Sequence, residues 1–418
     1  MPLFAGDLTL RGNLTIDVAV VGGGIQALLV LRKLAERYST AMFTRSNLGA
    51  GQTAHSHAFL HQGQMVARMP ELLKKLQAAK EDWDDLVPKE LLHETSFYWT
   101  PKEIPFDCPW NGLVPSNASV PFRVRRPAAL YEFPGHYINA HDVVSHIGAP
   151  LLSQIRRIYQ IDQLGVSPNN EITFRIAADS DRTAGYRVTA KAVVFAAGAG
   201  NHRLISELTK ELGYRGQQTI KAFMLIIQGK EGNALNRGQL PHHSGFFPSE
   251  RIFIAPRRHN GESVWLVGDG QRFWIQHPAD WLHMSARDWF RRLRVPLFDL
   301  VPELATYGKE FAWGYYEAVK AEGDHDGGFP ENSPTIELLG NLPAIAVWPG
   351  LFTLAPSAAC KVATQTEALI GSQVRTPAPV WPADLHPPVI ERETWLDTPL
   401  WSWSEFNHLL NGSGALAS

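Results

Sequence analysis

The sequence predicts an α/β protein with two sheets built from interleaved chain segments, and three observations support this. Residues 18–21 form a short apolar run that leads into glycines, and residues 25–34 then have the composition of an apolar helix. Residues 193–195 form a second such run, which also ends in glycines. Runs of this kind are typical of parallel strands buried on both faces. Between and after them, segments such as 223–227 and 263–268 indicate strands of a second, β-rich unit.

The glycine turn predicts a phosphate site. Gly22 permits the tight turn, and Gly24 lets the backbone approach a pyrophosphate. Ala27 takes the small-residue position of the G-x-G-x-x-G/A pattern, and the helix that begins at Ile25 and Gln26 supplies amide donors and its dipole. The pattern favours a bound dinucleotide, and the alternative is an ordinary tight turn between strand and helix.

Residues 40–44 form the next candidate strand and complete a β-α-β unit. An acidic residue usually ends this strand and binds the adenosine ribose. Thr44 stands there instead, followed by Arg45. The Thr44 hydroxyl can still bond to ribose without a charge, whereas Arg45 favours the alternative of a 2′-phosphate and a nicotinamide cofactor.

Further along the chain, the pattern predicts helices at 70–86, 140–153, 280–294 and 353–370, and strands at 96–99, 155–161, 171–176, 251–256 and 344–347. We assign residues 1–66, 138–220 and 335–375 to the first domain, and residues 67–137 and 221–334 to the second. Residues 101–137 are rich in proline and aromatics and predict a β-rich cap. Residues 376–418 form a C-terminal strap.

The bulk composition excludes several classes of protein. The net charge of the 418 residues is −2 at pH 7, without long runs of like charge, so no nucleic-acid partner is indicated. We find no signal peptide and no apolar run of transmembrane length. The two cysteines, Cys108 and Cys360, fit a reducing, cytoplasmic setting, and their spacing predicts no metal site.

Six segments in order resemble the D-amino-acid oxidase superfamily of FAD-dependent oxidoreductases, which includes glycine oxidase, sarcosine oxidase and glycerol-3-phosphate dehydrogenase. They are the glycine turn and residues 49–63, 135–144, 193–200, 252–257 with 264–268, and 351–359. The resemblance implies a Rossmann-like FAD-binding domain and an interleaved β-rich substrate domain, an antiparallel sheet with helices.

The resemblance also implies cofactor contacts along these segments. The expected cofactor-binding residues are Gly22, Gly24, Ile25, Gln26, Thr44, Arg45, Gln52, Thr53, Ala54, His55, His61, Ile158, Ala197, Gly198, Leu351, Phe352, Thr353 and Leu354. His61 matches a histidine beside the flavin in the dehydrogenases, and a covalent flavin link at this residue is an alternative. Leu351 stands where the family usually has glycine, which allows less backbone to approach the flavin.

A second departure concerns substrate binding. The family's amino-acid oxidases clamp the substrate carboxylate with an arginine, and Tyr316 takes its place here. Lys320, Arg257 or Arg258 would then supply the charge from another direction. We expect His61, Tyr316, Arg257 and Lys320 to form the catalytic group.

The resemblance predicts oxidation of a C–N bond in an amine or amino acid by hydride transfer to FAD, with oxygen or another electron acceptor reoxidising the flavin. Two alternatives stay open. One is a dehydrogenase of a hydroxy acid or polyol phosphate, and the other is a flavoprotein that has lost turnover.

Overall fold

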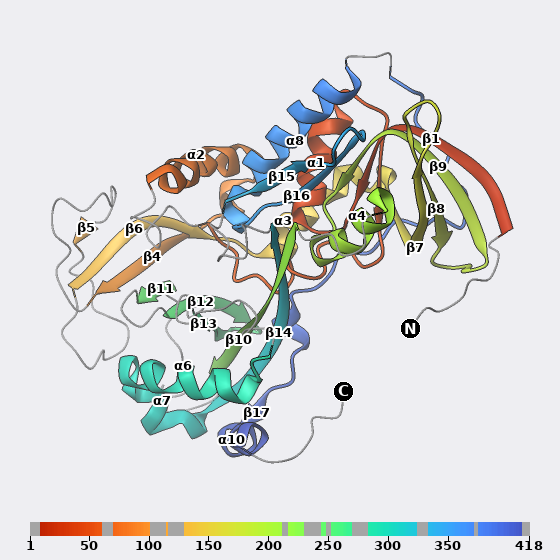
Figure 1. Ribbon diagram of the computed structural model, residues 1–418. Coiled ribbons are helices and arrows are strands. Elements are labelled where there is room, and N and C mark those ends of the chain that lie inside the picture. Colours follow the sequence, from red (N-terminus) through yellow and green to blue (C-terminus); the bar gives the residue numbers. More distant parts are fainter. Residues whose placement is uncertain are drawn as a thin grey trace.

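The computed structural model describes residues 9–60, 70–100, 114–115, 129–210, 216–229, 244–247, 252–269, 283–323, 333–371 and 375–411. Two sheets and their covering helices form a mixed α/β fold, as predicted (Figure 1). The first sheet has seven strands, which are β1 (Thr9–Val21), β2 (Thr40–Thr44), β7 (Ile155–Val166), β8 (Ile172–Ala178), β9 (Ala184–Phe195), β15 (Thr335–Leu338) and β16 (Ala344–Trp348).

The centre of the first sheet is parallel. Strands β7, β2, β1, β9 and β16 lie side by side in that order, and each neighbouring pair is parallel. The long strand β9 pairs with β1 along one edge, whereas its other edge pairs first with β8 and then with β16. Strands β7, β8 and β9 therefore form an antiparallel meander that packs beside the parallel centre.

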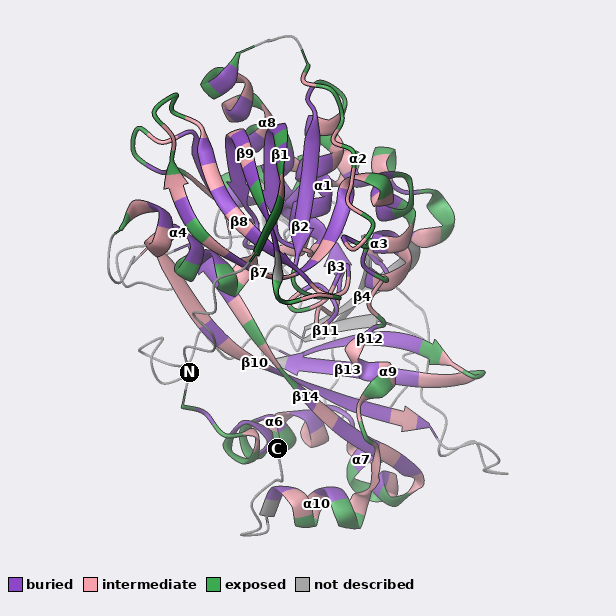
Figure 2. Ribbon diagram, turned by 90° about the vertical axis from the view of Figure 1, so that its right-hand side faces the viewer, coloured by how far each residue is buried: buried purple, intermediate pink, exposed green. Residues whose placement is uncertain are grey.

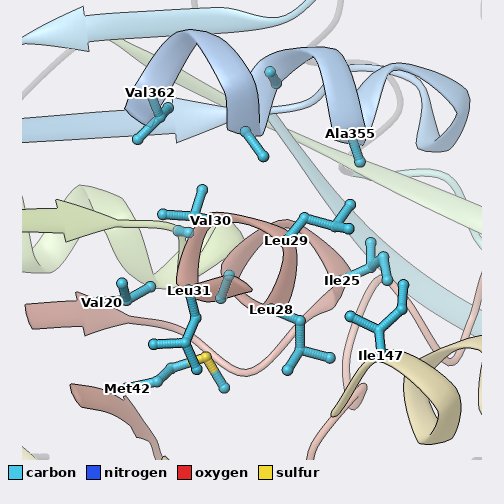
Figure 3. Packing of buried hydrophobic residues seen from close by; sticks show 14 of the residues in the cluster. Val20, Ile25, Leu28, Leu29, Val30, Leu31, Met42, Ile147, Ala355 and Val362 are labelled. Carbon is cyan, nitrogen blue, oxygen red and sulfur yellow. The ribbon is translucent and has the colours of Figure 1, made fainter. Parts of the chain in front are cut away.

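Helices α1 (Ile25–Ala35), α3 (Ala140–Gly148) and α8 (Ala355–Ile370) contribute to one apolar cluster with the central strands. Figure 3 shows Leu29 and Val30 of α1 directed toward α8, and Leu31 on the opposite side near Met42 of β2. Helix α4 (Asn201–Thr209) belongs to a second cluster with the meander. The sequence of α1 is apolar almost throughout because the helix is covered on both sides.

The second sheet has ten strands. In spatial order they are β17 (Trp401–Ser402), β14 (Phe311–Gly323), β10 (Gln217–Gly229), β13 (Glu262–Asp269), β12 (Ile252–His259), β11 (Ser244–Phe247), β4 (His93–Thr100), β6 (Ala129–Tyr137) and β3 (Phe59–Leu60), with β5 (Val114–Pro115) paired to β6. Its pairs are antiparallel except for β11 with β4. Strands β10 and β14 extend as a long ribbon toward the first sheet (Figure 1).

The face of the second sheet that points away from the first is covered by α6 (Ala286–Leu300), α7 (Pro302–Tyr307) and α10 (Trp403–Asn411). Figure 2 shows exposed residues on the outer sides of these helices. The arginines of α6 are exposed as well. Helix α6 begins after Ser285, whose hydroxyl accepts a hydrogen bond from the Asp288 N–H at 3.1 Å. Ser285 is an ordinary N-cap, and the helix therefore starts later than the sequence pattern indicates and continues to Leu300.

The remaining elements are short or peripheral. Helix α2 (Pro70–Leu86) has the predicted bounds, and α9 (Thr394–Asp397) is a single turn. Within the described residues, 3-10 turns occur at Lys89–Leu91, Ala149–Gln154, Gly198–Gly200, Gly308–Glu310 and Phe352–Leu354. The last of these precedes α8, so that helix begins at Ala355 and not at Thr353. Most of the predicted cap at 101–137 lies outside the described residues.

The C-terminal segment 375–411 runs across both sheets. The Thr376 hydroxyl donates to Asp17 Oδ1 at 2.6 Å, the Leu48 N–H donates to Val389 O at 2.8 Å, and β17 pairs with β14. Asp17 is 1% exposed and also bonds to Lys191 Nζ at 2.8 Å. Burial alone raises the pKa of Asp17, but the bond from Lys191 and those from its other donors outweigh it and hold the pKa below its ordinary value.

Two expectations from the sequence, the domain boundaries and the absence of membrane-spanning helices, can be compared with the described residues. The domain boundaries stay a prediction, although the strands of the first sheet come from residues 9–44, 155–195 and 335–348. Within the part of the chain that the structure describes, none of the helices has both the length and the apolar character needed to cross a membrane.

Candidate active site

A cavity of about 960 Å³ extends from the glycine turn to the second sheet. The predicted site residues that line it are Gly22, Gly24, Ile25, Gln26, Thr44, Arg45, Gln52, Thr53, His55, Ile158, Ala197, Gly198, Lys320, Leu351 and Phe352. Residues at the ends of β1 and β2 and directly after β9 thus meet residues from β10 and β14 in one space. Ligands of open parallel sheets bind at this carboxyl edge of the strands.

The glycine turn is packed so closely that side chains are excluded. Gly22 has φ +146°, and a Cβ there would lie 2.2 Å from the backbone oxygen of Ala196. A Cβ at Gly23 would lie 2.2 Å from Thr44 Oγ1. At Gly24, the N-cap of α1, a Cβ would meet one atom of the described residues within 4 Å, which is Thr53 Oγ1 at 3.0 Å. Gly24 therefore leaves the side facing the cavity open for another group.

Thr53 supplies the cap that Gly24 lacks. The Ile25 N–H donates to Thr53 Oγ1 at 3.1 Å, across 28 residues of sequence. This bond joins the start of α1 to the loop after β2, from which Gln52, Thr53, His55 and Ser56 line the cavity. Two of the segments that the family resemblance assigns to the cofactor are therefore held together directly.

Gln26 is an unusual residue at the start of α1. It is 4% exposed, it lines the cavity, and neither polar atom of its side chain has a hydrogen-bond partner among the described residues. A buried, unpaired amide costs about 1–3 kcal/mol. Together with the open side of Gly24 at a helix N-terminus, this orphaned amide fits a site built for a polar, anionic group such as a cofactor diphosphate.

The end of β2 differs in detail from the expectation. The Thr44 hydroxyl donates to Ser46 O at 3.0 Å and accepts from the Ser46 N–H at 3.3 Å, so it is used within its own turn, although Thr44 lines the cavity. Arg45 Nε donates to Tyr159 O at 3.2 Å and thereby reaches across to β7. Ile158 of the same strand is fully buried and lines the cavity.

Residues 55–59, called the histidine loop below, line the other part of the cavity, except for Ala58. His55 Nδ1 lies 2.6 Å from Gly51 O. Because a carbonyl oxygen only accepts, Nδ1 carries the proton, and a neutral His55 ring leaves Nε2 as an acceptor. His57 has the opposite arrangement, since its Nδ1 accepts from the Phe59 N–H at 3.2 Å.

Tyr316 and Arg257 lie behind the cavity wall. Both are buried, at 7% and 4% exposure, and neither is among the described residues that line the cavity. The Tyr316 hydroxyl donates to His55 O at 3.2 Å, and Arg257 Nη2 donates to His57 O at 3.0 Å. Burial raises the pKa of Tyr316 far above its ordinary value, so its hydroxyl stays a donor.

Of the other expected residues, some line the cavity and others lie behind its wall. Lys320 lines the cavity and is ion-paired with Glu322, which is 2% exposed. Ala54, Thr353 and Leu354 are buried behind the wall, where the Thr353 hydroxyl donates to Phe59 O at 3.3 Å. His61 lies outside the described residues.

Sequence reasoning missed several lining residues on strands of the second sheet, which are Lys221, Met224, Phe253 and Glu317. His57 and Phe59 also line the cavity, and they fall in the segment 49–63 that resembles the family's flavin loop. Lys221 Nζ lies 2.9 Å from Glu317 Oε1, across the β10–β14 ribbon. The alternation of residues on β10 could have indicated Met224, but the pairing of Lys221 with Glu317 depends on strand register. Among the described residues, the structure has no cluster of side chains suited to a metal ion.

Comparisons with known proteins agree with this fold. No family model matches the chain. The chain is 27% identical over 291 residues to the probable FAD-dependent oxidoreductase PA4991 of Pseudomonas aeruginosa, which covers 61% of this chain and 68% of that protein. The crystal structure of PA4991 is similar with a TM-score of 0.65 and 19% identity, covering 92% of this chain and 98% of that one.

Glycine oxidase from Geobacillus kaustophilus is similar with a TM-score of 0.59 and 15% identity, over 91% of this chain and 99% of that chain. Iminodiacetate oxidase from Chelativorans sp. BNC1 has a TM-score of 0.59 and 14% identity, over 90% and 100% of the two chains. These findings confirm the predicted resemblance to FAD-dependent oxidoreductases of the D-amino-acid oxidase type, and the similar structures show that the chain shares their fold.

Proposed function

We propose that the protein is an FAD-dependent oxidoreductase that oxidises a C–N bond in a small amine or amino acid. The observation that carries the proposal is the single cavity that joins the glycine turn of β1 and α1 to His55 and the second sheet. The enzyme class and the cofactor agree with the name of the Pseudomonas aeruginosa relative. The parallel strands and the glycine turn support a Rossmann-like FAD-binding domain.

The residues along the cavity would divide the work. The open side of Gly24, the N-terminus of α1 and Gln26 would hold the diphosphate, and Ile158 would contact the adenine. Bound FAD would supply the hydride acceptor. His55 Nε2 would take the proton from the substrate ammonium, because His55 Nδ1–H is already bonded to Gly51.

The charges on the second-sheet side favour an amine over a polyol phosphate. Of the described lining residues there, Lys221 is paired with Glu317 and Lys320 with Glu322. A phosphate dianion would need cations that are not neutralised by carboxylates. A neutral or zwitterionic substrate suits this side of the cavity, where the two lysines are paired with glutamates. The expected clamp by Lys320 and the role of His61 stay predictions.

Several proteins of similar fold are named for C–N chemistry, among them L-amino acid deaminase from Proteus vulgaris and L-proline dehydrogenase from P. horikoshii, both with TM-scores of 0.59. Glycerol-3-phosphate dehydrogenase from Bacillus halodurans, with a TM-score of 0.56, keeps the hydroxy-compound alternative open. The structural likeness concerns the fold, so the substrate class has to be decided by reaction.

The test is anaerobic mixing of the FAD-loaded protein with separate panels of amines, amino acids, hydroxy acids and polyol phosphates. We expect the visible flavin band to bleach with an amine or amino acid, and peroxide to form in air if oxygen is the acceptor. His55→Asn should still bind FAD but slow the bleaching by about 100-fold. Bleaching by hydroxy compounds alone, or by no compound, would exclude C–N oxidation.

A further inference from the structure

We propose that Tyr316, Arg257 and Glu393 are positioning residues that fix the histidine loop in the cavity. Through Glu393 the C-terminal strap would then set the position of His55. The inference deepens the proposed function, because it takes His55 as the proton acceptor, but its first test needs neither FAD nor substrate.

The first observation is that each bonded carbonyl of the histidine loop is held from a different element. His55 O accepts from Tyr316 of β14 at 3.2 Å, and His57 O accepts from Arg257 of β12 at 3.0 Å. Ala58 O accepts from the N–H of Ile138 at 3.0 Å, and Phe59 O accepts from the Thr353 hydroxyl at 3.3 Å. The two longest side chains in this set come from the second sheet, so they set the distance between that sheet and the loop.

The second observation is the burial of the Arg257 guanidinium. Its side chain is 3% exposed. Nη1 donates to Pro256 O at 2.9 Å, and Nη2 also lies 3.4 Å from Ile138 O. A buried cation held mainly by carbonyls needs a counter-charge, and removal of that counter-charge is strongly unfavourable.

Glu393 of the strap provides this counter-charge. Its side chain is also 3% exposed, and its Oε1 lies 3.8 Å from Arg257 Nε. Oε1 accepts from the Ala140 N–H at 3.2 Å, and Oε2 accepts from Trp395 Nε1 at 2.7 Å. The next residue, Thr394, donates its N–H to Ala54 O at 3.4 Å, directly before the histidine loop. The strap is thus linked to the loop both through Arg257 and through Ala54.

This arrangement explains why Tyr316 and Arg257 are polar and yet do not line the cavity. They donate to the backbone carbonyls of His55 and His57, and these two residues do line the cavity. A displacement of about 1 Å in a reacting group can cost about 100-fold in rate. The positioning residues therefore act on the reaction through the loop.

Hydrogen exchange of the unloaded protein tests the loop directly, because the N–H groups of residues 55, 56, 58 and 59 bond within or next to the loop. We expect exchange of these amides to be about tenfold faster in Tyr316→Phe and in Glu393→Gln. In the FAD-loaded protein, the same variants should change the visible circular dichroism and the reduction potential of the flavin.

Two matched controls separate positioning from general destabilisation. Tyr186→Phe also removes a buried hydroxyl that bonds to the strap, since Tyr186 donates to Asp384 Oδ1 at 2.7 Å. Arg156→Met matches Arg257→Met, because Arg156 is 7% exposed, donates to Ile155 O and Leu152 O, and lies 4.1 Å over the ring of Trp381 in the strap. Neither Tyr186 nor Arg156 is among the described residues that line the cavity. These controls should lower Tm and leave loop exchange and the flavin signals unchanged.

The proposal is overturned if Tyr316→Phe and Glu393→Gln leave loop exchange at the wild-type rate, or if the controls accelerate it equally. Should Arg257→Met fail to fold, the other two variants still decide the question. If the wild-type protein binds no FAD, the proposed function is refuted. Faster loop exchange in Tyr316→Phe and Glu393→Gln than in the wild type would then still support the positioning role.

Discussion

Substitution of Gly24 by alanine separates cofactor binding from folding. Gly24 has φ −84° and ψ 178°, a conformation that alanine adopts without strain. The new Cβ would lie 3.0 Å from Thr53 Oγ1 and would meet no other atom within 4 Å. The main cost to the unloaded protein is a weaker Ile25 to Thr53 bond, which is worth about 1 kcal/mol. The new methyl group, however, would stand where the proposed site brings the diphosphate to the backbone.

The expected loss in FAD binding is much larger. If the methyl group breaks one or two charge-assisted hydrogen bonds to the diphosphate, the binding free energy falls by about 1.5–3 kcal/mol, which is about 10-fold to 150-fold in Kd. Titration of the apoprotein with FAD, followed by flavin fluorescence, measures Kd, and urea unfolding without FAD measures stability.

Two glycine substitutions calibrate this experiment. Gly165→Ala meets no atom within 4 Å and should alter neither Kd nor stability by much. Gly22→Ala should prevent folding, because its φ is +146° and its Cβ would lie 2.2 Å from Ala196 O. A Gly24→Ala protein that binds FAD as tightly as wild type would refute the assignment of the diphosphate to this turn.

Three further substitutions test other parts of the structure. Gln26→Leu removes the unpaired amide, so urea unfolding of the unloaded protein should show a gain in stability of about 1 kcal/mol. The same substitution should reduce the rise in Tm that FAD produces. A less stable apoprotein would contradict this. The lowered pKa of Asp17 means that its contribution is present above the unfolded pKa of about 3.9 and is lost as the pH falls through the lower folded value. Asp17→Asn should therefore lower the free energy of unfolding by about 3 kcal/mol at pH 7. It should also make this free energy fall less steeply as the pH is lowered into the acid range, and an unchanged fall would contradict the prediction. Gly268→Ala would place a Cβ 2.0 Å from the ring of Phe253, a residue that lines the cavity, so the ring must move. We expect KM for the substrate to rise about tenfold in steady-state kinetics while the Kd for FAD stays the same in a titration. An unchanged KM with weaker FAD binding would contradict this.

The sequence is most informative where local chemistry decides the structure. The glycine turn, α1 and the return to a parallel strand at β9 follow from residue type and period alone, because only glycine fits at Gly22 and only an apolar helix can be covered on both sides. The bounds of α2 follow from its apolar spacing for the same reason.

The roles of Tyr316 and Arg257 could not be predicted in this way. The alternation of residues along a strand indicates which side chains are buried. It does not distinguish a side chain that reaches a cavity from one that donates to the backbone behind the cavity wall. Glu393 was not predicted at all, because its contact with Arg257 joins a strap without periodic pattern to a distant strand. Such long-range pairs depend on the tertiary fold and have no local signal.

The central claim is that the glycine turn and the histidine loop border one FAD site, and titration of the apoprotein with FAD by calorimetry and visible absorption tests it most directly. We predict saturable binding of one FAD per chain, with a perturbed flavin spectrum and protection of the amides of residues 22–26 and 52–57 from hydrogen exchange. A folded protein that shows no heat, no spectral change and no protection with FAD would contradict the account.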